Sequence, residues 1–262
     1  MSYAIYAKHG PVVWLTINRP EVMNALHRDA NIEMTEHVDT FKQDDDARVL
    51  ILTGAGERAF SAGNDLKATA AATARGERRS RSSDGRAVFF GGIVGNPCSK
   101  PVIAAVNGYA MGGGFELALA CDLIVAADHA RFALPEPRVG LVAGAGGMHR
   151  LPAQIPLKQA MGLLLTGRQI SAQEALRLGV VNEVVTAAEL TAAVERWVND
   201  ILAASPVSVR LTKQSVMAGL HLSVEDAMLQ DAPRLAELYA SEDFIEGPRA
   251  FAEKRPPVWK GR

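Results

Sequence analysis

The chain has 262 residues, which fits a single large domain and is long enough to bury a substantial hydrophobic core. Hydrophobic residues make up 48% of the chain and charged residues 22%, which is the balance of a globular protein. The net charge of −1 provides no general attraction to nucleic acid or to an anionic membrane, so we expect neither as a partner.

Segments that target or anchor a protein are not apparent in this sequence. No apolar stretch reaches the ~20 residues of a membrane span. The first residues have neither a basic start nor an apolar run, so we expect no signal peptide and a cytoplasmic location. The two cysteines, Cys98 and Cys121, show neither a metal-ligand spacing nor a disulfide framework. We expect them to be buried free thiols, and we predict no metal site.

The first half of the chain alternates strand-like and helix-like patterns. Ile5–Lys8 and Val12–Ile17 predict a β-hairpin that is broken at Gly10. The polar stretch Asn18–Asn24 predicts a turn, and a helix is expected from about Leu26 to about Lys42.

Three short, continuous apolar runs follow, and each is typical of a strand covered on both faces: Val49–Thr53, Val102–Val106 and Leu123–Ala126. Helices between such strands indicate βα units and an α/β fold. Ligand sites in open α/β sheets favour the carboxyl ends of strands. The turn-rich segments Gly54–Gly63 and Asn107–Gly114, directly after the first two strands, are therefore the first places to expect a site.

The second half of the chain is predicted to be mostly helical, with no linker and no internal repeat. Ser171 with Glu174 and Thr186 with Glu189 are capping boxes, and Ser205-Pro206 is a further helix start. One helix is expected from Ser223 through Tyr239. A last helix, from about Glu242 to Lys254, would place Phe251, Lys254 and Arg255 on one face.

One segment, Ala68–Arg86, is rich in arginine among Ala, Ser and Gly. Its five arginines are Arg75, Arg78, Arg79, Arg81 and Arg86. We expect a solvated surface loop, and the alternative is an anion-attracting flap beside a ligand site. The charge run alone does not distinguish them.

Three glycines, Gly112–Gly114, open an apolar helical pattern that contains Glu116. The first turn of a helix has backbone N–H groups without internal partners, and glycines let a ligand approach them closely. Such a place can hold a phosphate or an oxyanion formed during a reaction, although three glycines often indicate only close packing. The stretch has neither a phosphate-loop nor a dinucleotide-binding spacing.

Two glutamates are candidates for acid/base work. Glu116 lies in an apolar stretch without a nearby cation, where a carboxylate is rarely buried without a partner. Glu136 follows an apolar run as well. Spacing alone favours surface positions for both glutamates, with Glu136 in a turn and paired with Arg138. Ser61 lacks a G-x-S-x-G elbow, which argues against a serine hydrolase.

Together, the motifs of the chain resemble the enoyl-CoA hydratase/isomerase (crotonase) family from end to end. The stretch Lys100–Glu116, with its sequence KPVIAAVNGYAMGGGFE, is the strongest single piece. The other matching stretches are Asn18–Pro20, Asn24–Leu26, Ala59–Asp65, Cys121-Asp122, Pro135-Glu136, Gly140-Leu141, Gly144–Gly147, Arg150–Pro152, Thr166–Arg168 and Phe251–Arg255.

The resemblance implies an α/β fold, a crotonase-like spiral of ββα units with a helical C-terminal region. Residues 1–200 would form the spiral core with the CoA-thioester site. Residues 201–262 would form the helical region for oligomerisation and CoA contact. Family members commonly form homotrimers or dimers of trimers. Coenzyme A is part of the substrate, so no separate cofactor is implied.

The resemblance also implies roles for individual residues. The backbone N–H groups of Asn64 and Gly113 would form the oxyanion hole, and Glu116 and Glu136 match the two glutamates of true hydratases. Gly144 would help to place the water through its N–H. The residues implied to contact CoA are Ser61, Ala62, Asp65, Leu66, Lys67, Gly144, Phe251 and Lys254.

The chemistry expected from these residues is the addition of water to a 2-enoyl-CoA thioester. Two N–H donors stabilise the negative charge on the thioester oxygen. We assign Glu116 to the water and Glu136 to proton delivery at C2. The sequence departs from the commoner forms of the family in its Arg-rich segment and at Asn64, where alanine is more usual. The Asn64 side chain is expected to reach a polar acyl group.

Three alternatives remain open at this stage. The first is an enoyl-CoA isomerase, although isomerases of the family usually keep one acid/base residue. The second is a dehydratase of a polar hydroxyacyl-CoA, such as carnitinyl-CoA. The third is a non-catalytic binding protein, which the presence of both glutamates and the near-neutral charge disfavour.

Overall fold

The computed structural model of the protein describes residues 2–75 and 87–262. The chain divides into two compact units. Unit 1 comprises Met1–Cys98 and Val102–Glu195, and unit 2 comprises Ser99–Pro101 and Arg196–Arg262. No helix of the described ranges is long and apolar enough to cross a membrane. The functional division at residue 200 stays a prediction.

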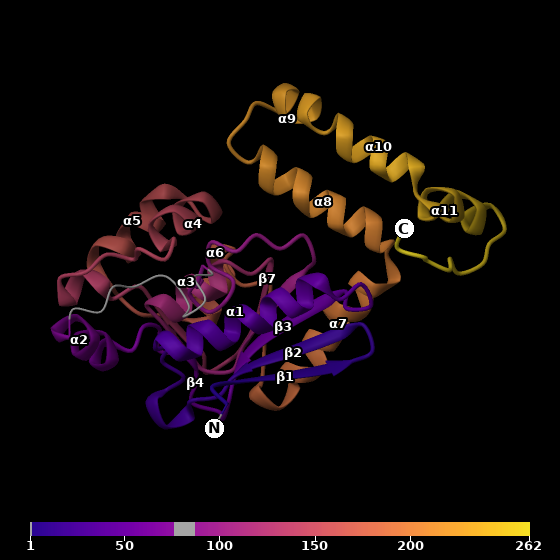
Figure 1. The fold of residues 1–262 in the computed structure, drawn as a ribbon. Helices are drawn as coiled ribbons and strands as arrows, with labels where there is room; N and C mark the ends of the chain where they lie inside the picture. Colours follow the sequence, from indigo (N-terminus) through magenta and orange to yellow (C-terminus); the bar gives the residue numbers. More distant parts are fainter. Residues whose placement is uncertain (1, 76–86) are drawn as a thin grey trace. The chain divides into compact units, whose positions relative to one another are not determined.

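Unit 1 is built on a large six-stranded sheet with the strand order β1-β2-β3-β5-β7-β10 (Figure 1). The strands are β1 Ala4–His9, β2 Val12–Ile17, β3 Val49–Gly54, β5 Val102–Val106, β7 Leu123–Ala127 and β10 Glu183–Val185. β1 and β2 form the antiparallel hairpin expected from the sequence, and all other neighbours are parallel. The continuous burial of β3 and β5 fits strands covered on both faces.

A second, smaller sheet with the order β4-β6-β8-β9 was not expected from the sequence. Its strands are β4 Ala59–Ser61, β6 Tyr109–Met111, β8 Arg131–Ala133 and β9 Ile170–Ser171. Strands of two or three residues are too short to show a period in the sequence. Because β4, β6 and β8 each follow a strand of the large sheet, the chain winds through successive ββα units, as the expected fold requires.

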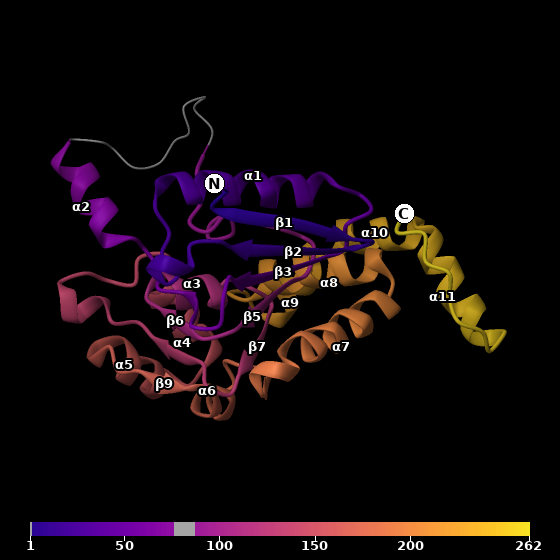
Figure 2. The same cartoon turned by 90° about the horizontal axis from the view of Figure 1, so that it is seen from below.

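The helices of unit 1 cover these sheets. They are α1 Arg28–Gln43, α2 Leu66–Ala74, α3 Gly113–Leu119, α4 Gly147–Gln154, α5 Leu157–Thr166 and α6 Ala172–Leu178, with the short 3-10 helices η1 Pro20–Val22, η2 Glu136–Val139 and η3 Ala187–Glu189. Helix α1 lies along one face of the large sheet (Figure 2). It buries Met34, Val38 and Phe41, which recur at helical spacing, in the core.

The two predicted capping boxes differ in the structure. At η3 both reciprocal bonds of the box between Thr186 and Glu189 are present. At α6 the Ser171 hydroxyl accepts the Glu174 N–H at 3.1 Å. The Glu174 carboxylate instead accepts from Arg168 at 2.5 Å. A guanidinium offers a charge-assisted bond, which is stronger than a bond from a neutral backbone N–H.

Unit 2 is helical. Its helices are α8 Pro206–Gly219, α9 Val224–Gln230, α10 Ala232–Ala240 and α11 Glu242–Ala252, and α7 Leu190–Ala203 spans the division between the units. The single helix expected from Ser223 through Tyr239 is wrong. It is interrupted at Asp231, because Pro233 has no N–H to continue the ladder and is instead accommodated in the first turn of α10.

A buried carboxylate holds three segments of unit 2 together. Asp243 in α11 is only 3% exposed. It accepts the hydroxyl of Ser205 at 2.8 Å, the N–H of Lys260 at 2.7 Å and the N–H of Gly261 at 3.1 Å. Ser205 in turn caps α8 by accepting the Ser208 N–H. One side chain therefore links the start of α8, the first turn of α11 and the final residues.

We expect Asp243→Ala to lower the free energy of unfolding of the protein by about 3 kcal/mol, because it leaves several buried donors without an acceptor. Asp226→Ala is the matched control, since Asp226 accepts the Ser223 hydroxyl at 2.8 Å in the same Ser–Asp arrangement at an exposed site. We expect less than about 1 kcal/mol there. Urea unfolding followed by circular dichroism measures both, and equal losses would contradict the role given to Asp243.

Candidate active site

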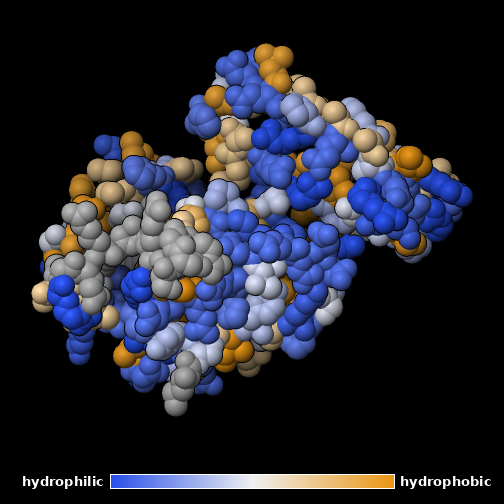
Figure 3. Space-filling view, in the orientation of Figure 1, coloured by the Kyte–Doolittle hydropathy of each residue, from blue (hydrophilic) through white to orange (hydrophobic). Residues whose placement is uncertain are grey.

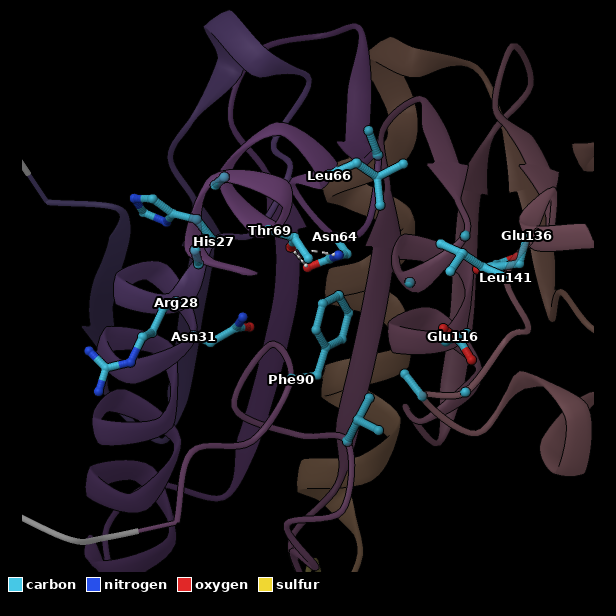
Figure 4. A pocket seen from close by; sticks show the side chains of 18 of the residues that line it. His27, Arg28, Asn31, Asn64, Leu66, Thr69, Phe90, Glu116, Glu136 and Leu141 are labelled. Atoms are coloured by element: carbon cyan, nitrogen blue, oxygen red, sulfur yellow. Dashed lines mark hydrogen bonds between the residues drawn. The ribbon is translucent and has the colours of Figure 1, made fainter. Parts of the chain in front are cut away.

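Unit 1 contains a cavity of about 770 Å³ (Figure 4). Its wall comes from the start of α1, the segment after β4, residues 88–94, the start of α3 and the segment after β8. The cavity thus lies at the carboxyl ends of β4, β6 and β8, the strands of the small sheet. The segments Gly54–Gly63 and Asn107–Gly114, where a site was expected, both contribute to this wall. Each also contains a short strand, β4 or β6, that the sequence did not reveal.

Two backbone loops meet at the centre of the cavity wall. A Cβ at Gly63 would lie 2.6 Å from the Gly113 nitrogen, and a Cβ at Gly113 would lie 3.4 Å from the Asn64 nitrogen. Gly63 also has a positive φ of 85°, which favours glycine. Within the described residues, the N–H of Asn64 makes no backbone hydrogen bond, and Gly113 stands in the first turn of α3, where the helix provides no acceptor. The structure thus brings together the two donors expected for an oxyanion hole.

Glu116 is carried by α3, one turn beyond Gly113, and is 3% exposed. Its Oε1 accepts the Gly147 N–H at 2.8 Å. Burial raises the pKa of Glu116, while hydrogen bonds from the backbone of Gly147 and Ala145 and the charge of Arg150 act in the opposite direction. The apolar surroundings thus make this carboxyl a stronger base than an exposed one.

Glu136 begins η2 on the same wall of the cavity (Figure 4). Its Oε1 would lie 2.9 Å from a Cβ at Gly112, so glycine is needed there to make room. Its Oε2 is buried without a hydrogen-bond partner among the described residues. Burial raises the pKa of Glu136, and the charge of Glu116 raises it further. A carboxyl that lines a cavity and has one oxygen without a partner in the protein is expected of a group that exchanges a proton with a ligand.

Comparisons with known proteins identify the family of this chain. The family model of enoyl-CoA hydratase/isomerase matches residues 7–262. The chain belongs to the enoyl-CoA hydratase/isomerase family. It is similar to a carnitinyl-CoA dehydratase from Citrobacter koseri, with 43% identity and 98% of both chains covered. Another carnitinyl-CoA dehydratase, from Salmonella enteritidis, is 42% identical with 100% of both covered. An enoyl-CoA hydratase structure from Mycobacterium tuberculosis has a TM-score of 0.90 at 38% identity, with 100% of both chains covered.

Other residues expected to contact CoA lie around the cavity of this crotonase-fold enzyme in different ways. Ala62, Leu66 and Gly144 line the cavity. Ser61 is fully buried, and its hydroxyl donates to Asn24 O and accepts the Gly63 N–H. It can therefore act on a ligand only through the loop that it supports. Lys67 is exposed and is not part of the cavity wall.

Asp65 is engaged within the protein. Its carboxylate accepts the Ala68 N–H at 3.0 Å, which caps α2, and Arg19 at 3.1 Å. Burial acts to raise the pKa of Asp65, but these bonds outweigh it and hold the pKa below the usual range. A contact between this side chain and CoA stays a prediction.

The role expected for the Gly144 N–H, which is to place the water, stays a prediction. This N–H donates to Val142 O at 2.7 Å across a tight three-residue turn, so it is not available to a water molecule in this structure. A nearby backbone N–H, that of Gly147, donates to the Glu116 carboxylate.

Phe251 and Lys254 belong to unit 2 and are exposed, Phe251 at 86%. The common helical face expected for them is wrong, because α11 ends at Ala252 and Lys254 has a left-handed backbone with a φ of 53°. Arg255 is held by Glu246 at 2.6 and 2.9 Å, and this contact lowers the pKa of Glu246 to about 2. CoA contact by Phe251 and Lys254 stays a prediction.

Sequence reasoning missed Phe90, whose ring lies against Gly113 in the middle of the cavity (Figure 4). A Cβ at Gly113 would be 2.5 Å from Cζ of Phe90. Two side chains of α1 hold the segment: Thr35 Oγ1 accepts the Phe89 N–H at 3.1 Å, and Asn31 Oδ1 accepts the Gly91 N–H at 2.7 Å. The run Phe89–Gly92, two aromatic residues followed by two glycines, was the feature of the sequence that could have indicated this part of the wall.

The structure describes only residues 68–75 of the Arg-rich segment Ala68–Arg86. The surface loop expected over Ala68–Arg86 is wrong for its first part, because Ala68–Ala74 belongs to helix α2. Arg75 lines the cavity, as the alternative of an anion-attracting segment beside a ligand site requires. Arg78, Arg79, Arg81 and Arg86 lie outside the described residues. Within the described parts of the chain, no group of three or more His, Cys, Asp or Glu side chains is arranged to hold a metal ion.

The raised pKa of Glu136 predicts a pH-dependent cost in stability. The folded protein binds this proton more tightly than the unfolded chain, so stability falls as pH rises from about 4 through the raised pKa. We expect Glu136→Gln to match the wild type near pH ~4 and to exceed its stability at pH ~8. Urea unfolding at several pH values measures the difference.

Glu174→Gln is the control, because its effect on stability should depend on pH in the opposite direction. The Arg168 hydrogen bond lowers the pKa of Glu174, so its stabilising effect is present at neutral pH and is lost as pH falls through the lowered pKa. This variant should be less stable than the wild type at pH ~8, by a small amount because the pair is near the surface. A Glu136→Gln protein that is less stable than the wild type at pH ~8 would contradict the buried, unpartnered carboxyl.

Proposed function

We propose that the protein is a hydro-lyase that interconverts 2-enoyl-CoA and 3-hydroxyacyl-CoA thioesters. The observation that carries the proposal is a pair of carboxyls, the buried Glu116 and the half-buried Glu136, on the wall of a cavity that also exposes two backbone donors. Acid/base catalysis of hydration needs one group to take a proton from water and another to give one to carbon.

In the proposed mechanism, the thioester oxygen accepts the N–H groups of Asn64 and Gly113. Ionised Glu116 takes a proton from water as the water oxygen bonds to C3. The electron pair of the C2=C3 bond moves to give an enolate, whose charge the two donors stabilise. C2 then takes the proton of Glu136. Dehydration follows the same steps in reverse.

The surroundings of the two carboxyls favour this division of roles. Burial raises the pKa of Glu116, and its backbone hydrogen bonds and the charge of Arg150 act against that rise in favour of the ionised form. Glu136 has a buried oxygen without a partner and feels the charge of Glu116, and both features keep its proton bound. Burial raises the pKa of both carboxyls, and the charge of Glu116 raises that of Glu136 further, which supports Glu136 as the acid and Glu116 as the base.

The names of the relatives suggest which acyl groups to test. Relatives at 42–43% identity are named carnitinyl-CoA dehydratase, which supports a polar acyl group. Structures at 38% identity named enoyl-CoA hydratase or probable enoyl-CoA hydratase/isomerase support a simple acyl group as the second candidate. We infer a hydro-lyase with a polar acyl preference and reversible action.

The direct experiment follows the ultraviolet absorbance of the conjugated 2-enoyl thioester. Crotonyl-CoA and crotonobetainyl-CoA should both lose this absorbance when the protein is added, and carnitinyl-CoA should gain it. An isomerase would instead convert 3-enoyl-CoA into 2-enoyl-CoA without adding water. Turnover of 3-enoyl-CoA alone would overturn the hydro-lyase proposal, and turnover of no thioester would support a binding protein.

We also propose that the protein assembles as a homotrimer or a dimer of trimers through unit 2. Apolar residues are exposed along α8, α9 and α10, as Figure 3 shows in part. They include Val216, Leu220, Val224, Met228, Leu229 and Leu235. Exposed apolar surface of this kind is typical of an interface. Light scattering on the purified protein tests the assembly.

A further inference from the structure

We propose that Arg150 is a positioning residue for the catalytic base: its guanidinium holds the turn that brings backbone N–H groups to the Glu116 carboxylate. The inference rests on the proposed function, because it takes Glu116 as the group that accepts a proton from water. Arg150 is not part of the cavity wall, so its effect on catalysis passes through other residues.

The turn Gly144–Gly147 leads into α4 and packs against Glu116. The Gly147 N–H donates to Oε1 of Glu116 at 2.8 Å, and the backbone of Ala145 provides a further hydrogen bond. A Cβ at Gly147 would lie 3.1 Å from both Cγ and Oε1 of Glu116, so the turn and the carboxyl are in close contact. The environment of the carboxylate therefore depends on the conformation of this turn.

Arg150, near the N-terminal end of α4, reaches back over the same turn. Side chains on a helix tilt toward its N-terminus, which gives the guanidinium this direction. Its Nη1 donates to Ala145 O at 3.1 Å. It passes over Gly146, where a Cβ would collide with Nη1 and where a positive φ of 104° also favours glycine. Ala145 is thus held through its carbonyl by Arg150, while its backbone also bonds to Glu116.

The same arrangement brings a positive charge near the carboxylate. Burial raises the pKa of Glu116, and the charge of Arg150 acts against that rise together with the backbone hydrogen bonds. The elements that pack most closely against α3 are β4, β6 and α4, and their titratable side chains are Tyr109 in β6 and His149 and Arg150 in α4. Glu136 faces the cavity from η2. Arg150 is the permanent cation of this set.

The needs of α4 itself do not explain an arginine at this position. The helix dipole disfavours a cation near the N-terminal end, and the first turn of α4 has no acidic residue to offset it. The N-cap residue, Gly146, provides no side-chain cap, and a guanidinium has no acceptor for the free N–H groups of the first turn. The Ala145 carbonyl and the Glu116 carboxylate account for its place instead.

The experiment measures kcat/KM for the hydration of crotonyl-CoA across pH, because the acid limb of this profile reports the ionisation of the base in the free enzyme. Arg150→Met removes both the tether of the turn and the positive charge, so the pKa of Glu116 should rise. We expect the acid limb to move to higher pH by about one pH unit. On the acid side, kcat/KM should then fall about tenfold, and much less above the limb. Arg150→Gln is a second neutral variant in case Arg150→Met does not fold.

Two further variants separate the charge and the position of Arg150. Arg150→Lys keeps a cation, so its acid limb should move less than half as far as that of Arg150→Met. Arg131→Met is the matched control, because the half-buried Arg131 also donates to backbone carbonyls, those of His129 at 3.1 Å and Ala130 at 2.9 Å. We expect its profile to match that of the wild type.

Exchange of the C2 proton of butyryl-CoA with D₂O is the second readout, since in the proposed mechanism it uses Glu136 and not Glu116. Arg150→Met should retain this exchange. A fall in hydration by the same factor at every pH would mean that Arg150 only supports the fold, and an equal shift in Arg131→Met would mean that its position is irrelevant. Loss of exchange together with hydration would mean that the whole site is damaged. Each of these results would overturn the role of Arg150 in a wild type that still hydrates crotonyl-CoA, whereas a wild type inactive on every enoyl thioester would overturn the proposed function.

Discussion

Replacing either carboxyl of the pair should lower the turnover of crotonyl-CoA by at least ~100-fold, as expected for the loss of a positioned proton-transfer group. Glu116→Gln keeps an oxygen that can accept the Gly147 N–H, so the local structure should survive while the base is lost. Glu136→Gln removes the acid from its place beside Gly112. Steady-state kinetics with crotonyl-CoA measures the effect, and Glu174→Gln, at the surface, should retain turnover.

The two roles can be separated by hydrogen exchange. Saturated butyryl-CoA has no double bond to hydrate, but its C2 proton can exchange with D₂O through Glu136 alone. We expect exchange to persist in Glu116→Gln and to be lost in Glu136→Gln, as mass spectrometry of the recovered thioester would show. The opposite pattern would reverse the assignment of acid and base. Near-normal hydration by both variants would exclude the mechanism.

Removal of the Gly113 N–H should lower kcat by roughly 100- to 1,000-fold, the range measured for a single oxyanion donor. Gly113→Pro removes this N–H at the first position of α3, where proline is compatible with a helix. Any side chain at this position also meets the Phe90 ring, because its Cβ would lie 2.5 Å from Cζ. The steric effect must therefore be separated from the loss of the donor.

A second substitution, Phe90→Ala, relieves the collision and provides the matched comparison. In this background, Gly113→Ala adds a Cβ and keeps the N–H, whereas Gly113→Pro adds a Cβ and loses the N–H. The difference in kcat between the two double variants reports the donor itself, provided that both show wild-type circular dichroism. Equal activity in the two would exclude the Gly113 N–H from the oxyanion hole.

Much of the large sheet followed from the sequence. The runs Val49–Thr53 and Val102–Val106 are long enough and apolar enough to predict buried parallel strands, and both were confirmed. The small sheet could not be predicted, because strands such as β9, with two residues, show no period. The break in the helix after Ser223 was foreseeable from Pro233, since proline cannot continue a helical ladder.

The candidate site was predictable in its members but not in its detailed contacts. Resemblance to the family identified Glu116, Glu136, Asn64 and Gly113, and the structure places all four on one cavity. Spacing alone could not have paired the glutamates, because they reach the cavity from different elements, α3 and η2. The Gly144 N–H donates to Val142 O, and a local turn of this kind leaves no signature in residue types, so the role expected for this N–H stays a prediction.

The three glycines before Glu116 also limit how this enzyme can vary by mutation. A Cβ at Gly112 would press on Glu136, one at Gly113 on Phe90, and one at Gly114 on the backbone of Ser61. Every single-base change in a glycine codon that alters the product introduces either a residue with a Cβ or a stop codon. No single-base change in any of the three codons therefore yields a different residue that fits the available space. Random mutagenesis followed by selection for activity should return this triplet unchanged. An escape at Gly113 should carry a second change at Phe90, whereas at Gly114 no second side-chain change relieves the collision, because the Cβ meets the Ser61 backbone.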